Sequence, residues 1–181
     1  MAVDHVKATG ITNMDTLNPR VRNTAGREGA PGQVVNIDDG YATAVASSSA
    51  DATYQLVRIP STAKVKHIVF ESEAQTAGKF DLGLYYATDG SSASSASSLL
   101  AAAAIDQDFF ATVIDCAAAV VRTDVTNEST TYTLDKRSQP IWQAVGLSSD
   151  PGGNFDIVAT VKTTAVTTGT GKFGITVTWV P

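Results

Sequence analysis

The sequence has a single cysteine, Cys116, among its 181 residues. One thiol cannot form an internal disulfide, and a structural zinc site of the cysteine type needs several thiolates. Both kinds of covalent or metal reinforcement are therefore excluded within one chain. Stability must come from packing of the chain itself or from assembly with other chains.

Long apolar runs and an excess of basic charge are also missing. No segment approaches the roughly 18 consecutive apolar residues that span a bilayer, and the opening "MAVDHVKATG" lacks the layout of a secretory signal. The formal net charge is −5, whereas nucleic-acid-binding proteins usually carry a basic face that neutralises phosphates. We therefore expect a soluble protein that is not exported by a standard route, with no nucleic acid and no membrane among its partners.

Hydrophobic residues make up 43% of the chain, which is enough for the core of one domain, with some length left over. Residues 1–32 differ from the rest because their apolar positions follow neither a helix nor a strand period, and proline and glycine interrupt them. This segment is also basic, with Arg20, Arg22 and Arg27, whereas residues 33–181 are acidic. The segment is either a flexible tail or an arm that becomes ordered on a neighbouring subunit, where its arginines pair with acidic surface.

After residue 33 the pattern changes to alternation with a period of two, which is typical of antiparallel strands. Five segments show it: 52–60, 64–72, 78–90, 154–166 and 171–181. The first places Tyr54, Leu56 and Arg58 on one face, and the second is apolar on both faces, as in a strand covered on both sides. In the third, Phe80, Leu82, Leu84 and Tyr86 share a face, and "TDG" at 88–90 signals a turn. The inward residues expected of the last two are Phe155, Ile157, Ala159 and Val161, and Phe173, Ile175, Val177 and Trp179. The Thr- and Gly-rich segment between these two strands reads as a hairpin connection, so the last two strands are expected to be neighbours.

The middle of the chain is less regular. "SSASSASSLLAAAA" at 91–104 is interpreted as a loop, and "IDQDFFATVIDCAAA" fits both a helix and a strand, with the strand favoured by its β surroundings. "SQPIWQAVGLSSDPGG" at 138–153 is the clearest helical segment, since Pro140 suits a first turn and Trp142, Val145 and Leu147 would face inward. We expect one short helix there.

Two catalytic patterns can be tested at this stage. A hydrolase nucleophile elbow needs Gly-x-Ser-x-Gly between a strand and a helix, but Asp150 occupies the last glycine position around Ser148, and the serine follows the helix. The histidine available to Ser148 in the body of the chain is His67, inside a strand, where such a residue is more often simply packed. "GTGKFG" at 169–174 lacks the full phosphate-loop spacing and precedes a strand.

Acidic residues at Asp38, Asp39, Asp106, Asp108 and Asp115 could ligate Ca²⁺ with loop carbonyls. Acidic residues at strand ends are ordinarily solvated, however, and no EF-hand loop is present. No cofactor is expected, and nothing in these patterns favours an enzyme.

Several sequence segments together resemble those of a known group of proteins. "YQLVRIPSTAKVKHIVFESEA", "FDLGLYYATDG", "AIDQDFFATVID" and "YTLDKRSQPIWQAVGLSSDPGGNFDIVATV", with the opening "VKATGITN", resemble a group of small tailed-bacteriophage virion proteins associated with the head. The resemblance covers roughly residues 50–165. It implies a capsid-associated structural protein of the decoration or cement type, although a lambda-type decoration protein is smaller and the chain does not look like one.

The expected fold is therefore all-β: a jelly-roll-like antiparallel β-sandwich over residues 33–181, with an extended N-terminal arm over residues 1–32 and one short helix. The expected function is that of a non-enzymatic virion protein, made in the host cytoplasm, which decorates and stabilises the capsid surface. Its partners would be the major capsid protein and its own copies, as a trimer or dimer, contacted through Arg20, Arg22 and Arg27 of the arm.

Two alternatives remain open from the sequence. One is a tail or head-to-tail component, such as a fibre or adaptor. The other is a carbohydrate-binding adhesion module, for which the candidate aromatic side chains with a polar group are Tyr41, Tyr85, Tyr86, Tyr132 and Trp142.

Overall fold

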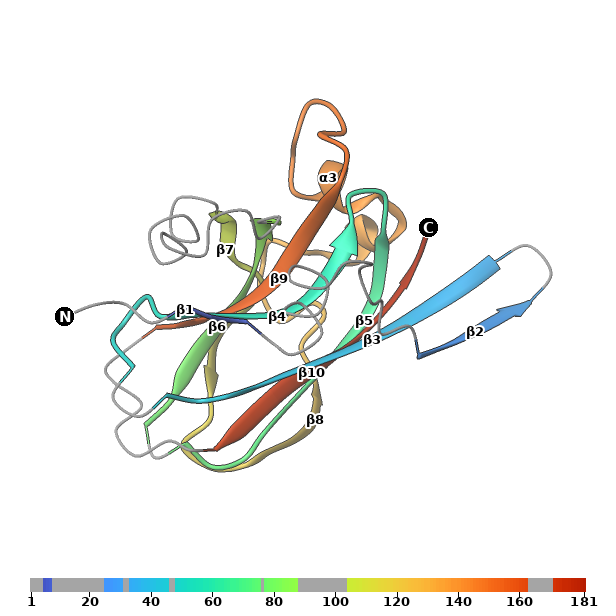
Figure 1. Ribbon diagram of the computed structural model, residues 1–181. Coiled ribbons are helices and arrows are strands. Elements are labelled where there is room, and N and C mark those ends of the chain that lie inside the picture. Colours follow the sequence, from blue (N-terminus) through green and yellow to red (C-terminus); the bar gives the residue numbers. More distant parts are fainter. Residues whose placement is uncertain are drawn as a thin grey trace, which may run out of the picture.

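Ten strands and two short helical segments make up the part of the chain that the computed structural model describes, namely residues 5–7, 25–30, 33–45, 48–75, 77–87, 104–162 and 171–181 (Figure 1). In chain order they are β1 (His5–Lys7), β2 (Ala25–Ala30), β3 (Gln33–Thr43), β4 (Thr53–Pro60), β5 (Lys64–Ser72), β6 (Lys79–Tyr86), β7 (Ala104–Asp115), β8 (Val120–Asp124), the 3₁₀ helix η1 (Leu134–Ser138), α3 (Ile141–Ala144), β9 (Asn154–Val161) and β10 (Lys172–Val180). No helix within these ranges is long and apolar enough to cross a membrane.

The strands form two sheets that pack face to face. Sheet A has the order β1-β4-β9-β6-β7 and sheet B the order β2-β3-β10-β5-β8. Apart from the hairpin of β6 and β7, consecutive strands from β3 to β10 alternate between the sheets, which is the arrangement of an eight-stranded jelly roll. The predicted β-sandwich is confirmed. The pairs are antiparallel except β1 with β4, which is parallel.

The prediction that the last two strands are neighbours is wrong. β9 pairs with β4 and β6 in sheet A, whereas β10 pairs with β3 and β5 in sheet B. In a jelly roll most successive strands belong to opposite sheets, so each strand pairs with strands that are distant in the sequence. The predicted turn at 88–90 and the connection at 163–170 lie outside the described residues, as do residues 91–103 of the predicted loop.

Aromatic side chains from both sheets fill the centre of the sandwich. Phe173 of sheet B stacks on Phe80 of sheet A with ring centroids 4.6 Å apart, and it meets Tyr54 edge-on at 5.1 Å. The predicted inward residues of β6, β9 and β10 are buried here, namely Phe80, Leu82, Leu84, Phe155, Ile157, Ala159, Val161, Phe173, Ile175 and Val177. Tyr86, which was expected among them, is 43% exposed, and Trp179 is only partly buried against the core.

Bulges overturn two predicted strand faces. In β4 the register shifts between Gln55 and Val57, so that Val57 and Ile59 join Tyr54 and Leu56 in the core. Arg58 consequently lies on the opposite face from Tyr54, although strict alternation placed them together. A bulge inserts one extra residue into the strand, so every later residue of that strand points to the opposite face from the one that strict alternation gives.

A second bulge affects β5. The register there shifts between His67 and Val65 relative to β10, which puts Val65 on the core side together with Ile68 and Phe70. His67 and Val69 are only half-buried on the other side. The expectation of a strand covered on both faces was therefore wrong for β5.

The predicted short helix is present as α3, and Pro140 is its N-cap. Its start is anchored to the turn between β4 and β5, because the backbone N–H of Ile141 donates to the carbonyl of Ala63 at 2.8 Å. The buried side chains are Ile141 and Ala144, which are spaced by three. Trp142, Val145 and Leu147, predicted to face inward, are only partly buried against the core. α3 has only four residues, about one turn, so Val145 and Leu147 lie beyond its end.

The segment 104–115 is a strand, β7, as favoured from the sequence, whereas β3 and β8 were not predicted as separate strands. The free edge of β7 is covered by the following loop: Ser129 N–H donates to the carbonyl of Phe110 at 2.8 Å, and the Glu128 carboxylate accepts from Thr112 N–H at 2.7 Å. Tyr132 holds this loop by donating its buried hydroxyl to the carbonyl of Val65 at 2.8 Å. At the far edge of sheet B, β8 is exposed along four of its five residues.

Candidate functional site

The outer face of sheet A is polar but buried. Because side chains alternate along a strand, the residues between the core positions of β4, β6 and β9 point away from the sandwich centre. They include five polar side chains that are at most 1% exposed: Thr53, Gln55, Asp81, Asp156 and Thr160. Buried polar groups of this kind are tolerated when hydrogen bonds satisfy them, so the contacts of the charged groups decide what this face does.

Asp156 and Arg58 form the most buried ion pair of this face. Arg58 Nε and Nη2 donate to the two carboxylate oxygens of Asp156 at 2.6 and 2.9 Å, and the arginine side chain is only 5% exposed. Gln55 Nε2 adds a third hydrogen bond to the same carboxylate at 2.8 Å. This two-point geometry, with an extra donor, is the arrangement in which a buried carboxylate is best compensated.

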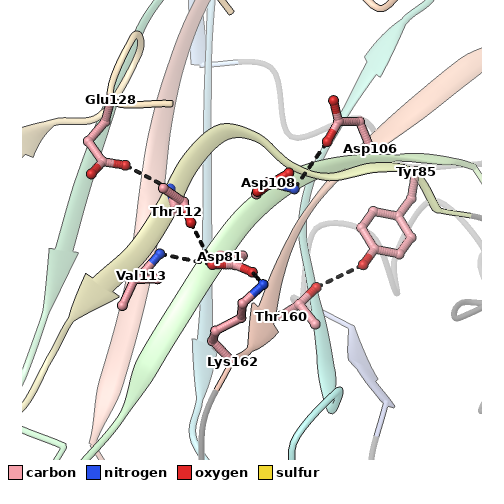
Figure 2. Close-up of polar contacts among 9 residues, drawn as sticks. All are labelled: Asp81, Tyr85, Asp106, Asp108, Thr112, Val113, Glu128, Thr160 and Lys162. Atoms are coloured by element: carbon pink, nitrogen blue, oxygen red, sulfur yellow. Dashed lines mark hydrogen bonds and ion pairs between the residues drawn. The ribbon is translucent and has the colours of Figure 1, made fainter. Parts of the chain in front are cut away.

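Asp81 is the centre of a second cluster (Figure 2). One carboxylate oxygen accepts from the backbone N–H of Val113 at 2.8 Å, and Lys162 Nζ lies 2.8 Å from the other. The hydrogen bond and charge of Asp81 raise the pKa of Lys162 above its ordinary value. Val113 has a positive φ of 54°. Asp81 therefore holds a bulged segment of β7 in place, with Lys162 as the neutralising charge.

The strands β6 and β7 approach each other closely at Gly83, next to the Asp81 cluster. Gly83 has no side chain, and a Cβ at this position would come 2.2 Å from the carbonyl oxygen of Gln107. Only glycine lets β7 cross β6 at this distance. Beside the crossing, burial and a hydrogen bond with Asp108 raise the pKa of Asp106. Tyr85 hydrogen-bonds Thr160 across the same face at 2.8 Å, and burial raises the pKa of Tyr85 (Figure 2).

These polar groups do not form a catalytic arrangement in the part of the chain that the structure describes. Each charged centre of sheet A is bound to a structural partner, and no serine, cysteine or histidine adjoins the carboxylates as a nucleophile with its base would require. Cys116 is buried, which raises the pKa of its thiol to about 11 and keeps it protonated at neutral pH.

The fold separates the predicted catalytic residues, and among the candidates for calcium it keeps Asp106 and Asp108 in contact. His67 Nε2 lies 3.0 Å from a carboxylate oxygen of Asp124 on β8, whereas Ser148 is exposed in the loop that follows α3. Asp38 accepts a hydrogen bond from the Trp179 indole at 2.6 Å. Among the described residues, no three histidine, cysteine or acidic side chains gather as a metal site would require.

The outer face of sheet B has the opposite character, because it is open to solvent. Along β3 the outward side chains include Ile37 and Tyr41, which are 39% and 58% exposed, with the exposed Asp39 between them. On the edge strand β8, Val121 is 78% exposed. An open furrow crosses this face between β3 and β8. Exposed apolar side chains interleaved with charges are typical of a binding surface.

The aromatics considered for sugar binding divide between the two environments. Tyr85 and Tyr132 are buried and bonded inside the protein, and Trp142 packs against the core. Tyr41 and Tyr86 are exposed, on sheet B and sheet A respectively. The structure therefore leaves two of the five available to a ligand.

The predicted contact residues of the arm cannot be placed as a group. Arg20 and Arg22 lie outside the described residues, and Arg27 belongs to β2. Of the arm, β1 pairs with β4 and β2 pairs with β3, so both described pieces extend the sheets of their own sandwich. The arm boundary at residue 32 and the partner-binding role of these arginines stay predictions.

Sequence reasoning missed the buried pair of Arg58 and Asp156. A signal was present, because each is the only charged residue of its strand, and the two charges are opposite. It missed the furrow as well, since this surface combines strands that are distant in the sequence.

Comparisons with known proteins identify the fold. No family model and no curated relative matches the sequence. Among solved structures, a chain from "Capsid of Ralstonia phage GP4" is similar over 97% of both chains, with a TM-score of 0.61 and 12% sequence identity. A chain from "Cyanophage Pam1 capsid asymmetric unit" is similar over 91% of this chain and 96% of that one, with a TM-score of 0.51 and 14% identity. At such identities the similarity shows a shared fold.

Proposed function

We propose that this chain is a non-enzymatic structural protein of a phage virion, which lies on the capsid surface and stabilises it by binding the major capsid protein and further copies of itself. The observation that carries the proposal is the whole-chain similarity of fold to chains from two phage capsid structures, in which this fold spans nearly all of the matched chain. The neighbours are therefore of similar extent to this chain, rather than large proteins that contain such a domain.

The polar contacts support a structural role. In the described residues, the buried charges of sheet A hold strands together, whereas the outer face of sheet B carries the exposed Ile37, Tyr41 and Val121. A shell-binding protein needs a rigid body and a surface for partners, and many identical weak contacts on a lattice add to a strong attachment. This division between a saturated face and an open face fits that requirement.

The charge difference between the two parts of the chain supports a role for the arm. Residues 1–32 are basic and the remainder is acidic, so the arm is suited to acidic surface on a neighbouring subunit. Because β1 and β2 pair within the chain's own sheets, the proposed contact with a neighbouring subunit involves Arg20 and Arg22, which lie between these strands in the sequence, and Arg27 of β2.

A binding experiment tests the arm. The full-length protein and the triple variant Arg20→Glu, Arg22→Glu, Arg27→Glu are added to purified phage heads that lack this protein, and bound protein is measured at increasing salt. We expect the variant to lose on the order of tenfold or more in affinity, and wild-type binding to weaken as salt screens the charges.

The matched control replaces the same three arginines by lysine. This variant keeps the charge and is expected to retain most of the binding. Wild-type affinity in the glutamate variant would contradict the role of the arm, whereas wild-type protein that binds no heads would contradict decoration itself.

A further inference from the structure

The furrow on the outer face of sheet B has a defined construction. Pairing of β3, β10 and β5 places Tyr41, Gly174 and Glu71 in one row across the sheet. Gly174 presents only backbone, and a Cβ there would come 2.5 Å from the carbonyl oxygen of Gly40. Gly174 lines an open depression of about 630 Å³ on this face, together with Tyr41 and Glu71. Tyr41 forms one wall, and Val121 with Arg122 on β8 forms the other.

The residue types along the furrow are those of a protein interface. Tyrosine and arginine are the side chains most enriched among residues that dominate binding energy, and here Tyr41 and Arg122 lie on opposite walls. Val121, 78% exposed, adds an apolar contact on the Arg122 side. The charges have both signs, with acidic Asp39 on the Tyr41 side and basic Arg122 across the furrow. Such a surface matches a copy of itself when the rotation between the two copies places unlike charges opposite each other.

Strand order fixes how two such surfaces can match. Across sheet B the order β3-β10-β5-β8 puts Tyr41 and Arg122 on the outer strands of the furrow. Rotation by half a turn about an axis along the strands reverses this order in the second copy. Each β3 wall then faces the β8 wall of the partner, and the partner's Glu71 faces the backbone at Gly174.

We propose that two copies of this chain associate face to face through this furrow, about a two-fold axis along the strands, with Tyr41 and Asp39 of each copy against the partner's Val121 and Arg122. The proposal rests on the proposed virion function, in which copies of the chain bind one another, and it assigns the surface. A two-fold contact is reciprocal, so each good pairing occurs twice.

Charge reversal tests the pairing with the full-length protein in sedimentation experiments. Asp39→Arg alone and Arg122→Glu alone are each expected to raise the dimer dissociation constant by about tenfold or more. In an equimolar mixture of the two variants, association returns, because one copy then offers two positive groups to the two negative groups of the other. The double variant in a single chain is also expected to dimerise.

Apolar variants supply the matched control. Val121→Asp is expected to weaken the dimer, and Leu134→Asp, at a side chain that is 73% exposed on η1, is expected to leave it unchanged. Thermal unfolding of each variant shows that the fold is retained, since all four positions are exposed on the surface.

Three results would overturn the proposal: a wild-type chain that stays monomeric up to millimolar concentration, an oligomer that none of the furrow variants affects, or a mixture of the charge variants that stays dissociated. Saturable binding of a neutral oligosaccharide that Tyr41→Ala abolishes, without any change in association, would assign the furrow to a sugar instead. Particles that still carry many copies of a monomeric chain would overturn this pairing and leave the virion function intact.

Discussion

Asp156→Ala is expected to lower the free energy of unfolding by about 3–5 kcal/mol, the range found when one partner of a buried ion pair is removed. The variant leaves the guanidinium of Arg58 buried without the carboxylate that it contacts at 2.6 and 2.9 Å. It also removes the acceptor of Gln55 Nε2. The loss therefore combines the removal of the carboxylate that faces a buried guanidinium with the loss of a hydrogen bond to Gln55, and it is measured by urea unfolding at neutral pH.

The control for this prediction removes both charges together. The double variant Asp156→Leu, Arg58→Met removes both charges of this pair, so most of the lost stability is expected to return, as happens when buried ion pairs are replaced by apolar groups of similar volume. A loss below about 1 kcal/mol for Asp156→Ala, the level of an exposed pair, would show that water reaches this carboxylate.

Phe173→Ala is expected to cost about 3–5 kcal/mol, the usual range for deletion of a buried aromatic ring. Phe173 of sheet B is 2% exposed and packs against two aromatic rings of sheet A, with its ring centroid 4.6 Å from that of Phe80 and 5.1 Å from that of Tyr54. The cavity would open at the contact between the two sheets, where rigid strands on both sides limit collapse. The midpoint of urea unfolding is expected to fall with little change in its slope.

Two further substitutions bracket the effect. Phe173→Leu keeps much of the volume and is expected to cost clearly less than the alanine variant. Leu134→Ala, at a side chain 73% exposed, is expected to stay within about 0.5 kcal/mol of the wild type. Equal losses at Phe173 and Leu134 would contradict the position of Phe173 at the centre of the core.

The strands with strict alternation could be predicted because apolar side chains fill the core face of each. Phe155, Ile157, Ala159 and Val161 in β9 all reach the core as their spacing indicated. The predicted strand face was wrong where a bulge breaks the alternation, as at Arg58. A bulge depends on pairing with a partner strand, so it cannot be recognised in the sequence of one strand alone. The prediction failed also for the partners of β9 and β10, because pairing in a jelly roll is almost entirely non-local.

The surfaces were harder to predict than the core. The furrow joins Tyr41, Glu71, Val121 and Gly174, which come from four strands and share no spacing in the sequence. The short β8 carries an exposed valine within a polar segment, which in isolation is typical of a loop. Only sheet order shows that these residues form one surface.

The most direct test of the virion function is a count of the copies of this protein in purified phage particles, by quantitative mass spectrometry against the major capsid protein. A decorating protein is expected in hundreds of copies per particle, in a fixed ratio to the major capsid protein. A count no larger than a single ring or fibre at the tail needs, or the absence of the protein from the particles, would contradict the proposed role.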